Sequence, residues 1–316
     1  MSTKWEKRGM IYRPSGDGVL KTHATRPIPI SISEHTLRLF YSSRDDDDRM
    51  LPTFIDVDPR NPSTVITAHD RPLIGVGTPG YFDDSGVTVT SALQYKDGLY
   101  FYYSGWKRRR VVSFDLSIGV LRWDANDQCL RRIYKGPLIG QDRSHPLLAA
   151  APFVANDSGR FKMWYCSGTE WKFPAGRPEP NYTIFYAESD DGLTWIPRDG
   201  PVIPYAYDGE VISAPWVVKR STGYSMWYST RGSSSDVDKR YRIGYAESRD
   251  GVSWERLDGV AGISTSSTPD WDSEMVCYPA IWNFEDVTYM FYSGNHVGRG
   301  GIGYAVADRK LDIVEW

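Results

Sequence analysis

The pentapeptide MWYST at residues 226–230 is one of five versions of the same phrase. The others are LFYSS at 39–43, FYYSG at 101–105, MWYCS at 163–167 and MFYSG at 290–294. Their central tyrosines follow one another at steps of 62, 62, 63 and 64 residues: Tyr41, Tyr103, Tyr165, Tyr228 and Tyr292. Repeats of roughly this length indicate propeller blades or solenoid turns.

Each phrase is short, aromatic and flanked by turn residues, which is typical of a β-strand rather than a helix. The fourth repeat shows four such segments in order: VISAPWVV, YSMWYST, YRIGYAES and VSWERL. Four-stranded sheets repeated five times around an axis form a five-bladed β-propeller. The sequence therefore predicts an all-β, five-bladed β-propeller with four-stranded blades, occupying residues 1–316 as a single domain.

The two ends of the chain are predicted to complete one another. The last repeat supplies three strands, CYPAIW, YMFYSG and GIGYAVA, and then the chain nearly stops. The N-terminal text KWEKRGMIY resembles a fourth strand. We therefore expect residues 4–12 to form the outer strand of the last blade and to close the ring, which removes an open sheet edge.

A second repeated phrase marks the connection between the third and fourth strands. YAESDDGLTW at 186–195 and YAESRDGVSW at 245–254 are nearly identical. Asp-Gly is a preferred two-residue hairpin turn, so a hairpin is predicted at each, with Trp195 and Trp254 packed between blades. These turns lie on the face opposite to the loops that enter the first strands, and we interpret the phrase as scaffold.

Composition narrows the classes of function. With 37 basic and 40 acidic residues the net charge is −3, so nucleic acid is not an expected partner. Cys129, Cys166 and Cys277 are too few and too scattered for a disulfide framework or a zinc site, and no metal or cofactor is expected. The N-terminus has no apolar leader and no stretch is long enough to span a bilayer, which predicts a cytoplasmic protein without a membrane partner.

The loops that precede the first strand of each blade carry the candidate catalytic residues. Glu210 lies five residues before Pro215, and Glu274 lies five residues before Pro279. Two carboxylates in equivalent register on adjacent blades are expected to face one axial pocket, with Asp84 as a third. Paired carboxylates are what glycosidic cleavage requires, so these residues are predicted to be catalytic. The alternative is that the glutamates pair with arginines and cap strand ends.

The same face is predicted to hold aromatic and charged residues that bind a sugar. Aromatic rings cover the apolar faces of pyranose rings, whereas charged groups hydrogen-bond the hydroxyl groups. Several arginines suit a phosphate or a carboxylate, which favours an anionic ligand. The predicted binding residues are His23, Arg26, Arg44, Trp106, Arg143, His145, Glu170, Trp171, Arg231, Asn295 and His296.

The phrases YRIGYAESRDG, DWDSEMVCYP and MFYSGN, with the five tyrosine-serine strands, are similar to a known superfamily. The chain resembles the five-bladed propellers of glycoside hydrolase families 43, 32 and 130. It also resembles bacterial propellers of polysaccharide-biosynthesis loci and the N-terminal domain of plant glucosamine inositolphosphorylceramide transferases. The start of the first blade, KTHATRP, lacks the general-base aspartate of family 43, and the arginines fit the pockets of family 130 better.

Two functions follow as expectations. The first is a carbohydrate-active enzyme that cleaves or forms a glycosidic or glycosyl-phosphate bond of an anionic or phosphorylated sugar. Glu274 or Glu210 would be the general acid, and Asp84 or the other glutamate the base. The second is a non-catalytic propeller that binds a glycan or a nucleotide sugar.

Overall fold

The structure is a computed structural model that describes residues 3–96, 98–173, 176, 178–232 and 240–316. The chain divides into two compact units. Unit 1 comprises Met1–Pro72, Trp216–Ser229 and Arg240–Glu315, and unit 2 comprises Leu73–Pro215, Thr230–Lys239 and Trp316.

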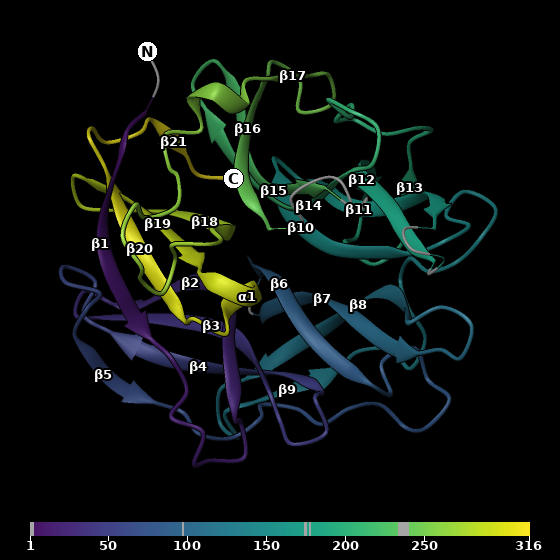
Figure 1. Ribbon diagram of the computed structural model, residues 1–316, viewed down its shortest axis with the longest axis horizontal. Coiled ribbons are helices and arrows are strands. Elements are labelled where there is room, and N and C mark those ends of the chain that lie inside the picture. The colour runs from purple at the N-terminus through teal and green to yellow at the C-terminus, as the bar shows by residue number, and fades with distance from the viewer. Residues whose placement is uncertain (1–2, 97, 174–175, 177, 233–239) are drawn as a thin grey trace. The chain divides into compact units, whose positions relative to one another are not determined.

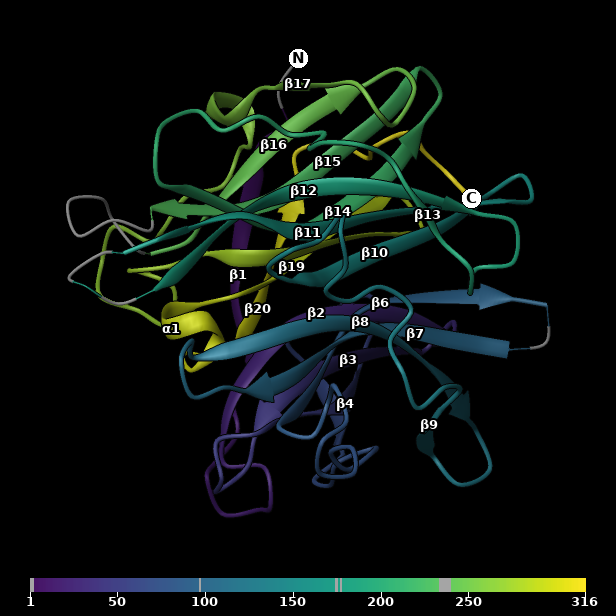
Figure 2. The ribbon, with the colours of Figure 1, turned by 90° about the vertical axis from the view of Figure 1, so that its right-hand side faces the viewer.

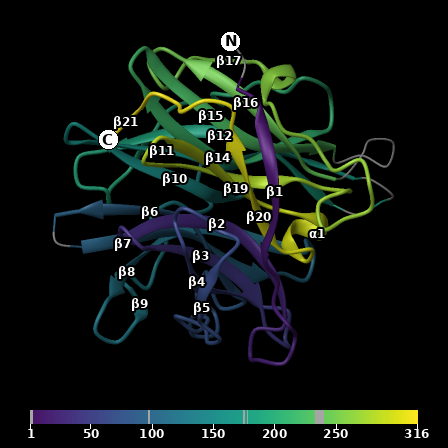
Figure 3. The same cartoon turned by 90° about the vertical axis from the view of Figure 1, so that its left-hand side faces the viewer.

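Unit 1 contains the sheet that joins the two ends of the chain (Figures 1 and 3). Its strand order is β1-β20-β19-β18, with the bounds β1 (Trp5–Tyr12), β18 (Cys277–Phe284), β19 (Val287–Ser293) and β20 (Ile302–Ala307). β1 pairs antiparallel with β20, with Trp5 opposite Ala307 and Tyr12 opposite Ile302. The N-terminal strand is therefore the outer strand of the last sheet, as the sequence predicted.

Two further sheets contribute to unit 1. One is the sheet of β2 (Thr22–Ser33), β3 (Thr36–Arg44), β4 (Met50–Val57) and β5 (Val65–Ala68), whose inner strand β2 packs against β18 and β19. The other has the order β17-β16-β15-β14-β21, with β14 (Glu210–Arg220), β15 (Gly223–Gly232), β16 (Arg242–Ser248), β17 (Trp254–Arg256) and β21 (Ile313–Val314). The short C-terminal strand β21 adds a fifth strand to this sheet through Lys219 and Arg220. The helical segments are η2 (Asp258–Val260) and α1 (Asn295–Gly298).

Unit 2 contains two four-stranded sheets, and Figure 2 shows β10, β11 and β12 of one of them side by side. The first sheet is β6 (Gly86–Tyr95), β7 (Gly98–Arg108), β8 (Phe114–Asp124) and β9 (Cys129–Arg132). The second is β10 (Ala149–Asp157), β11 (Arg160–Lys172), β12 (Glu179–Ser189) and β13 (Ile196–Pro197). Inner strand β10 packs against β6, β7 and β8.

Five antiparallel sheets, four of them with four strands and one with β21 as a fifth, are those of a five-bladed β-propeller, which confirms the predicted fold class. In the described part of the chain no helix is both long and apolar enough to cross a membrane.

The serine of the repeated phrase links neighbouring sheets at three places. The first strands carry a bulge in which the residue before a proline has a left-handed backbone: Arg26, Ala151, Ala214 and Tyr278, with φ of 58°, 49°, 53° and 57°. Proline disfavours the right-handed helical region for the residue before it, so this residue adopts another conformation. Three of these residues donate their backbone N–H to the serine of the neighbouring phrase, from Arg26 to Ser293, from Ala151 to Ser104 and from Tyr278 to Ser229, at 2.8–3.0 Å. At these three places the serine satisfies a backbone donor of the next sheet, whereas the third phrase has Cys166 instead and the Ser42 hydroxyl of the first has no hydrogen-bond partner among the described residues.

The turns after the second phrase differ from the predicted two-residue hairpins. Asp191 does not have a positive φ; only Gly192 does, with φ of 74°. The Asp191 carboxylate accepts hydrogen bonds from the backbone N–H groups of Leu193 and Thr194, and the Ser189 hydroxyl accepts from Gly192. A side chain that hydrogen-bonds the backbone two residues on builds a longer loop than a tight hairpin. Trp195 packs edge-on against Tyr102 of the preceding sheet, as expected.

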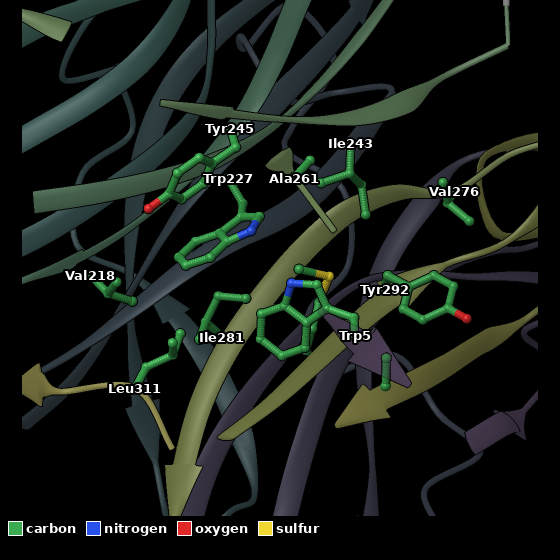
Figure 4. Close-up of a cluster of buried hydrophobic side chains, with 12 residues drawn as sticks. Trp5, Val218, Trp227, Ile243, Tyr245, Ala261, Val276, Ile281, Tyr292 and Leu311 are labelled. Carbon is green, nitrogen blue, oxygen red and sulfur yellow. The ribbon is translucent and has the colours of Figure 1, made fainter. Parts of the chain in front are cut away.

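A cluster of buried side chains anchors the N-terminal strand in unit 1 (Figure 4). Trp5 is 7% exposed and contacts Trp227 edge-to-face, with ring centroids 6.0 Å apart. The ring centroid of Trp227 in turn lies 4.8 Å from that of Tyr245. The strand is thus held by apolar packing as well as by its hydrogen bonds to β20.

Candidate functional site

Three of the predicted binding residues meet around one cavity in unit 1. The cavity has a volume of about 660 Å³, in the range of small-molecule sites, and His23, Asn295 and His296 line it. Its walls come from the β1–β2 connection, from the loop before β18 and from α1 with the residues that follow it. These are strand-four-to-strand-one and strand-two-to-strand-three connections, the loops in which the sequence predicted the site.

The charges around this cavity are mainly positive. Arg13, Lys21 and Arg299 line it, together with a single carboxylate, that of Asp270. Within the described ranges Arg13 and Arg299 form no ion pair, and the Lys21 ammonium lies 3.8 Å from the exposed carboxylate of Asp46. A cavity with this balance favours an anionic ligand.

His23 is buried beside the cavity in a neutral state. Its Nδ1 is hydrogen bonded to the Thr22 hydroxyl at 2.9 Å, and its backbone has φ of 67°. Burial lowers the pKa of His23 to about 4, and the positive charges of Arg44 and Arg299 act in the same direction. At neutral pH the ring is therefore an uncharged hydrogen-bonding group.

Asn295 holds the loop that precedes β18. Its Oδ1 accepts hydrogen bonds from the backbone N–H groups of Glu274 and Met275 at 2.8 and 2.9 Å, and its Nδ2 donates to the Asp270 carbonyl at 2.9 Å. The side chain is thus used to fix a loop that carries three carboxylates, those of Asp270, Asp272 and Glu274, of which Asp272 is buried and paired with Lys7. Immediately after it, His296 and Val297 have left-handed backbones with φ of 53° and 55°. Non-glycine residues in this region cluster at functional sites.

Of the predicted catalytic residues, Glu274 belongs to unit 1 and lies beside a residue of this cavity's lining. Its side chain is 51% exposed, and Oε2 lies 3.9 Å from Nε2 of His296, which does line the cavity. The Glu274 backbone carbonyl accepts a hydrogen bond from the Arg242 guanidinium at 2.9 Å.

Glu210 and Asp84 belong to unit 2 and are more constrained. Glu210, at the start of β14, is 1% exposed, and its carboxylate accepts hydrogen bonds from the Ala206 N–H and the Thr230 hydroxyl, both at 2.6 Å. The Asp84 carboxylate accepts from the Gly80 N–H at 2.9 Å and the Ser85 hydroxyl at 2.8 Å. Equal spacing to a proline therefore does not give Glu210 and Glu274 equal environments.

Unit 2 has a smaller cavity of about 360 Å³ that includes two predicted binding residues, Trp171 and Arg231. Phe114 and Tyr182 complete its aromatic wall. The neighbouring Glu170 forms an exposed ion pair with Lys172 at 2.9 Å.

Two predicted binding residues, His145 and Trp106, have structural contacts. His145 is 1% exposed; its Nε2 is hydrogen bonded to the Tyr165 hydroxyl at 2.6 Å, and its Nδ1 to Asp142 at 3.0 Å. Neither ring nitrogen remains for a ligand, so we omit His145 from the proposed site. Trp106 donates its indole N–H to the Thr88 hydroxyl at 2.8 Å.

The remaining arginines vary in their contacts. The Arg26 guanidinium stacks on the ring of Tyr278 at 3.8 Å, and Arg44 pairs with Asp48 at 2.6 Å. Arg143 is exposed and has no ion pair in the described part of the chain.

Sequence reasoning missed five residues of the unit 1 cavity: Arg13, Lys21, Asp270, Trp271 and Arg299. They lie in connections that differ from repeat to repeat, so the repeat comparison gives no signal for them. The indole of Trp271 stacks on Tyr292, with centroids 5.1 Å apart. Asp270 and Trp271 are the first two residues of DWDSEMVCYP, and this was the one available clue.

The sequence has a clear relative. No established family model matches the chain. Uncharacterized protein Rv1502 of Mycobacterium tuberculosis is 33% identical over 307 residues, which cover 96% of this chain and 99% of the relative.

Solved structures with the same fold are glycoside hydrolases. A protein described as a glycoside hydrolase has a TM-score of 0.76 at 16% identity, covering 99% of this chain and 94% of its own. A thermostable family-43 glycoside hydrolase has a TM-score of 0.60 at 17% identity, covering 91% and 89%. A structure from the GH130 family of mannoside phosphorylases has a TM-score of 0.67 at 11% identity, covering 97% and 94%. These likenesses confirm the predicted resemblance at the level of the fold.

Proposed function

The chain belongs to the family of the mycobacterial protein Rv1502, and we propose that it is a glycan-active enzyme of the propeller type. Its substrate is an anionic or phosphorylated sugar, and the bond that it acts on is glycosidic or glycosyl-phosphate. The fold shared with glycoside hydrolases supports this general class.

The observation that carries the proposal is the unit 1 cavity. Its lining contains the indole of Trp271, three cationic side chains and the carboxylate of Asp270. Aromatic faces with convergent polar groups suit the two chemistries of a sugar, its apolar ring faces and its hydroxyl groups. Beside it, Asn295 fixes the loop that carries Glu274.

We assign the general acid to Glu274. A general acid donates a proton to the leaving-group oxygen, so its carboxyl group must reach the substrate. The Glu274 carboxylate is half exposed and lies beside His296, whereas those of Glu210 and Asp84 accept hydrogen bonds from their own surroundings. Glu210 or Asp84 remains the proposed base.

The test is a screen of aryl glycosides, sugar phosphates and nucleotide sugars with the wild-type chain and three variants. Glu274→Gln and Glu210→Gln should each lower turnover by roughly 10²-fold, the scale of general acid–base catalysis. Glu255→Gln, at an exposed position of β17, is the matched control and should be fully active. Full activity of both test variants on a turned-over substrate would refute the assignment of the two glutamates.

The second candidate is a propeller that binds a glycan or nucleotide sugar without catalysis. The hydrogen bonds that occupy both oxygens of Glu210 and of Asp84 favour it, because such carboxylates serve structure rather than proton transfer. Binding by calorimetry without turnover in the screen, with equal affinity for wild type and Glu274→Gln, would support this function over the enzyme.

A further inference from the structure

One ring nitrogen of His23 is open to the unit 1 cavity. His23 is 8% exposed and lines the cavity. Its Nδ1 is hydrogen bonded to Thr22, whereas its Nε2 has no hydrogen-bond partner among the described residues. If the Thr22 hydroxyl donates to Nδ1, the neutral ring carries its proton on Nε2. Nε2 is then a hydrogen-bond donor that a ligand in the cavity can use.

The charges of the cavity are also mainly positive. Arg13, Lys21 and Arg299 line it with one carboxylate, Asp270, and the Lys21 ammonium also lies 3.8 Å from the carboxylate of Asp46, which is outside the lining. Arg299 lies close enough to His23 for its charge to influence the ring. Arg13 and Arg299 are exposed and form no ion pair among the described residues, so both guanidinium groups are available to an anion.

We propose that this cavity binds a phosphoryl group, as carried by a sugar phosphate or a nucleotide sugar. Arg13, Lys21 and Arg299 neutralise its charge, and His23 donates a hydrogen bond from Nε2. A phosphate monoester carries about two negative charges at neutral pH and three acceptor oxygens, so it can contact two guanidinium groups at once better than a carboxylate, which carries one charge and two oxygens. Trp271, held by its stacking on Tyr292, supplies an apolar wall for the ring that bears the phosphoryl group.

This inference deepens the proposed function and rests on it only for the sugar that carries the group. The phosphoryl site itself stands on His23, the three cations and the cavity. None of these cations was among the residues that the sequence singled out, because the sequence drew attention to Arg26, Arg44, Arg143 and Arg231. Of those four, Arg26 stacks on Tyr278 and Arg44 pairs with Asp48.

Calorimetric titration of the full chain tests the site with four probes: inorganic phosphate, glucose 1-phosphate, glucose and glucuronate. We expect glucose 1-phosphate to bind, with phosphate weaker, and glucose and glucuronate at least tenfold weaker than glucose 1-phosphate. Arg13→Met and Arg299→Met should each weaken binding of glucose 1-phosphate by tenfold or more, in proportion to the loss of a charge-assisted contact. Arg249→Met, which removes an exposed arginine of unit 1 outside the cavity, should leave the affinity unchanged.

An NMR titration of the His23 ring adds a second measurement, and phosphate would leave it unchanged if His23 had only a structural role. A bound dianion favours the imidazolium form, so saturating phosphate should raise the pKa of His23 from about 4. Absence of phosphate binding at millimolar concentration, binding that Arg13→Met and Arg299→Met do not weaken, or a His23 titration that phosphate does not shift would overturn the proposal. Equal affinity for glucuronate would also overturn it, in favour of a carboxylate site.

The two proposals fail separately. Phosphate binding that depends on Arg299, combined with an inactive screen, would refute the enzyme and leave the phosphoryl site standing. Turnover that depends on Glu274, with no effect of Arg13→Met or Arg299→Met on affinity, would refute the phosphoryl site alone.

Discussion

Replacing Trp5 by alanine tests whether the N-terminal strand is an integral part of the last blade. The side chain is 93% buried in a cluster that includes Trp227 and Ile281, so the substitution removes apolar burial and leaves a cavity. A buried tryptophan covers up to about 250 Å². At about 25 cal/mol per Å² that area corresponds to about 6 kcal/mol, an upper bound because real unfolded chains already bury some surface. We therefore expect Trp5→Ala to lower the free energy of unfolding by about 3–5 kcal/mol.

The measurement is urea unfolding followed by circular dichroism and tryptophan fluorescence. The indole N–H of Trp5 has no hydrogen-bond partner among the described residues, so Trp5→Phe loses packing but no hydrogen bond. It should cost clearly less than Trp5→Ala and keeps the test informative if the alanine variant does not fold. Glu6→Ala, on the exposed side of the same strand, is the control and should change stability by less than about 0.5 kcal/mol. A Trp5→Ala variant within about 1 kcal/mol of wild type would mean that β1 is not required to complete the sheet.

Three other predictions concern unit 2. Gly192→Ala should lower the free energy of unfolding by about 1 kcal/mol or more, because φ of Gly192 is 74° and the new Cβ would lie 3.0–3.1 Å from neighbouring side chains. An unchanged midpoint of urea unfolding would contradict this. Backbone N–H donors lower the pKa of Asp191 to about 2, so its stabilising contribution is present above about pH 4 and disappears as the pH falls toward 2. The melting temperatures of wild type and Asp191→Asn should therefore converge between pH 4 and pH 2. A difference in melting temperature that stays constant over this range would contradict the prediction. Trp316→Ala should lower the melting temperature by a few degrees, because the ring centroid of Trp316 lies 6.5 Å from that of Phe153 and 6.0 Å from that of Trp164. An unchanged melting temperature would show that these contacts contribute little.

Part of the site could be located from the sequence. The spacing of the repeats assigned strands to each blade, and the connections between strands follow from their order. The loops around His23, Asn295 and His296 were therefore expected on one face, and the three residues line one cavity. The residues of unit 1 that complete the cavity, such as Arg13 and Asp270, could not be found in this way. They have no counterpart at the same place in the other repeats, and a comparison of repeats detects only what recurs.

The sequence by itself determined the fold class, the five repeats and the origin of the outer strand of the last blade, because strand periodicity and the tyrosine-serine phrase are local patterns. Tertiary structure decided which polar residues are accessible. Glu210 and Glu274 have the same spacing to a proline, yet one is 1% exposed and the other 51% exposed, and His145 is enclosed by Asp142 and Tyr165. The physical reason is that the environment of a loop side chain is set by residues outside its own short pattern, here His296 of α1 for Glu274, Thr230 of β15 for Glu210 and Tyr165 of β11 for His145. No local pattern records which of those segments come together.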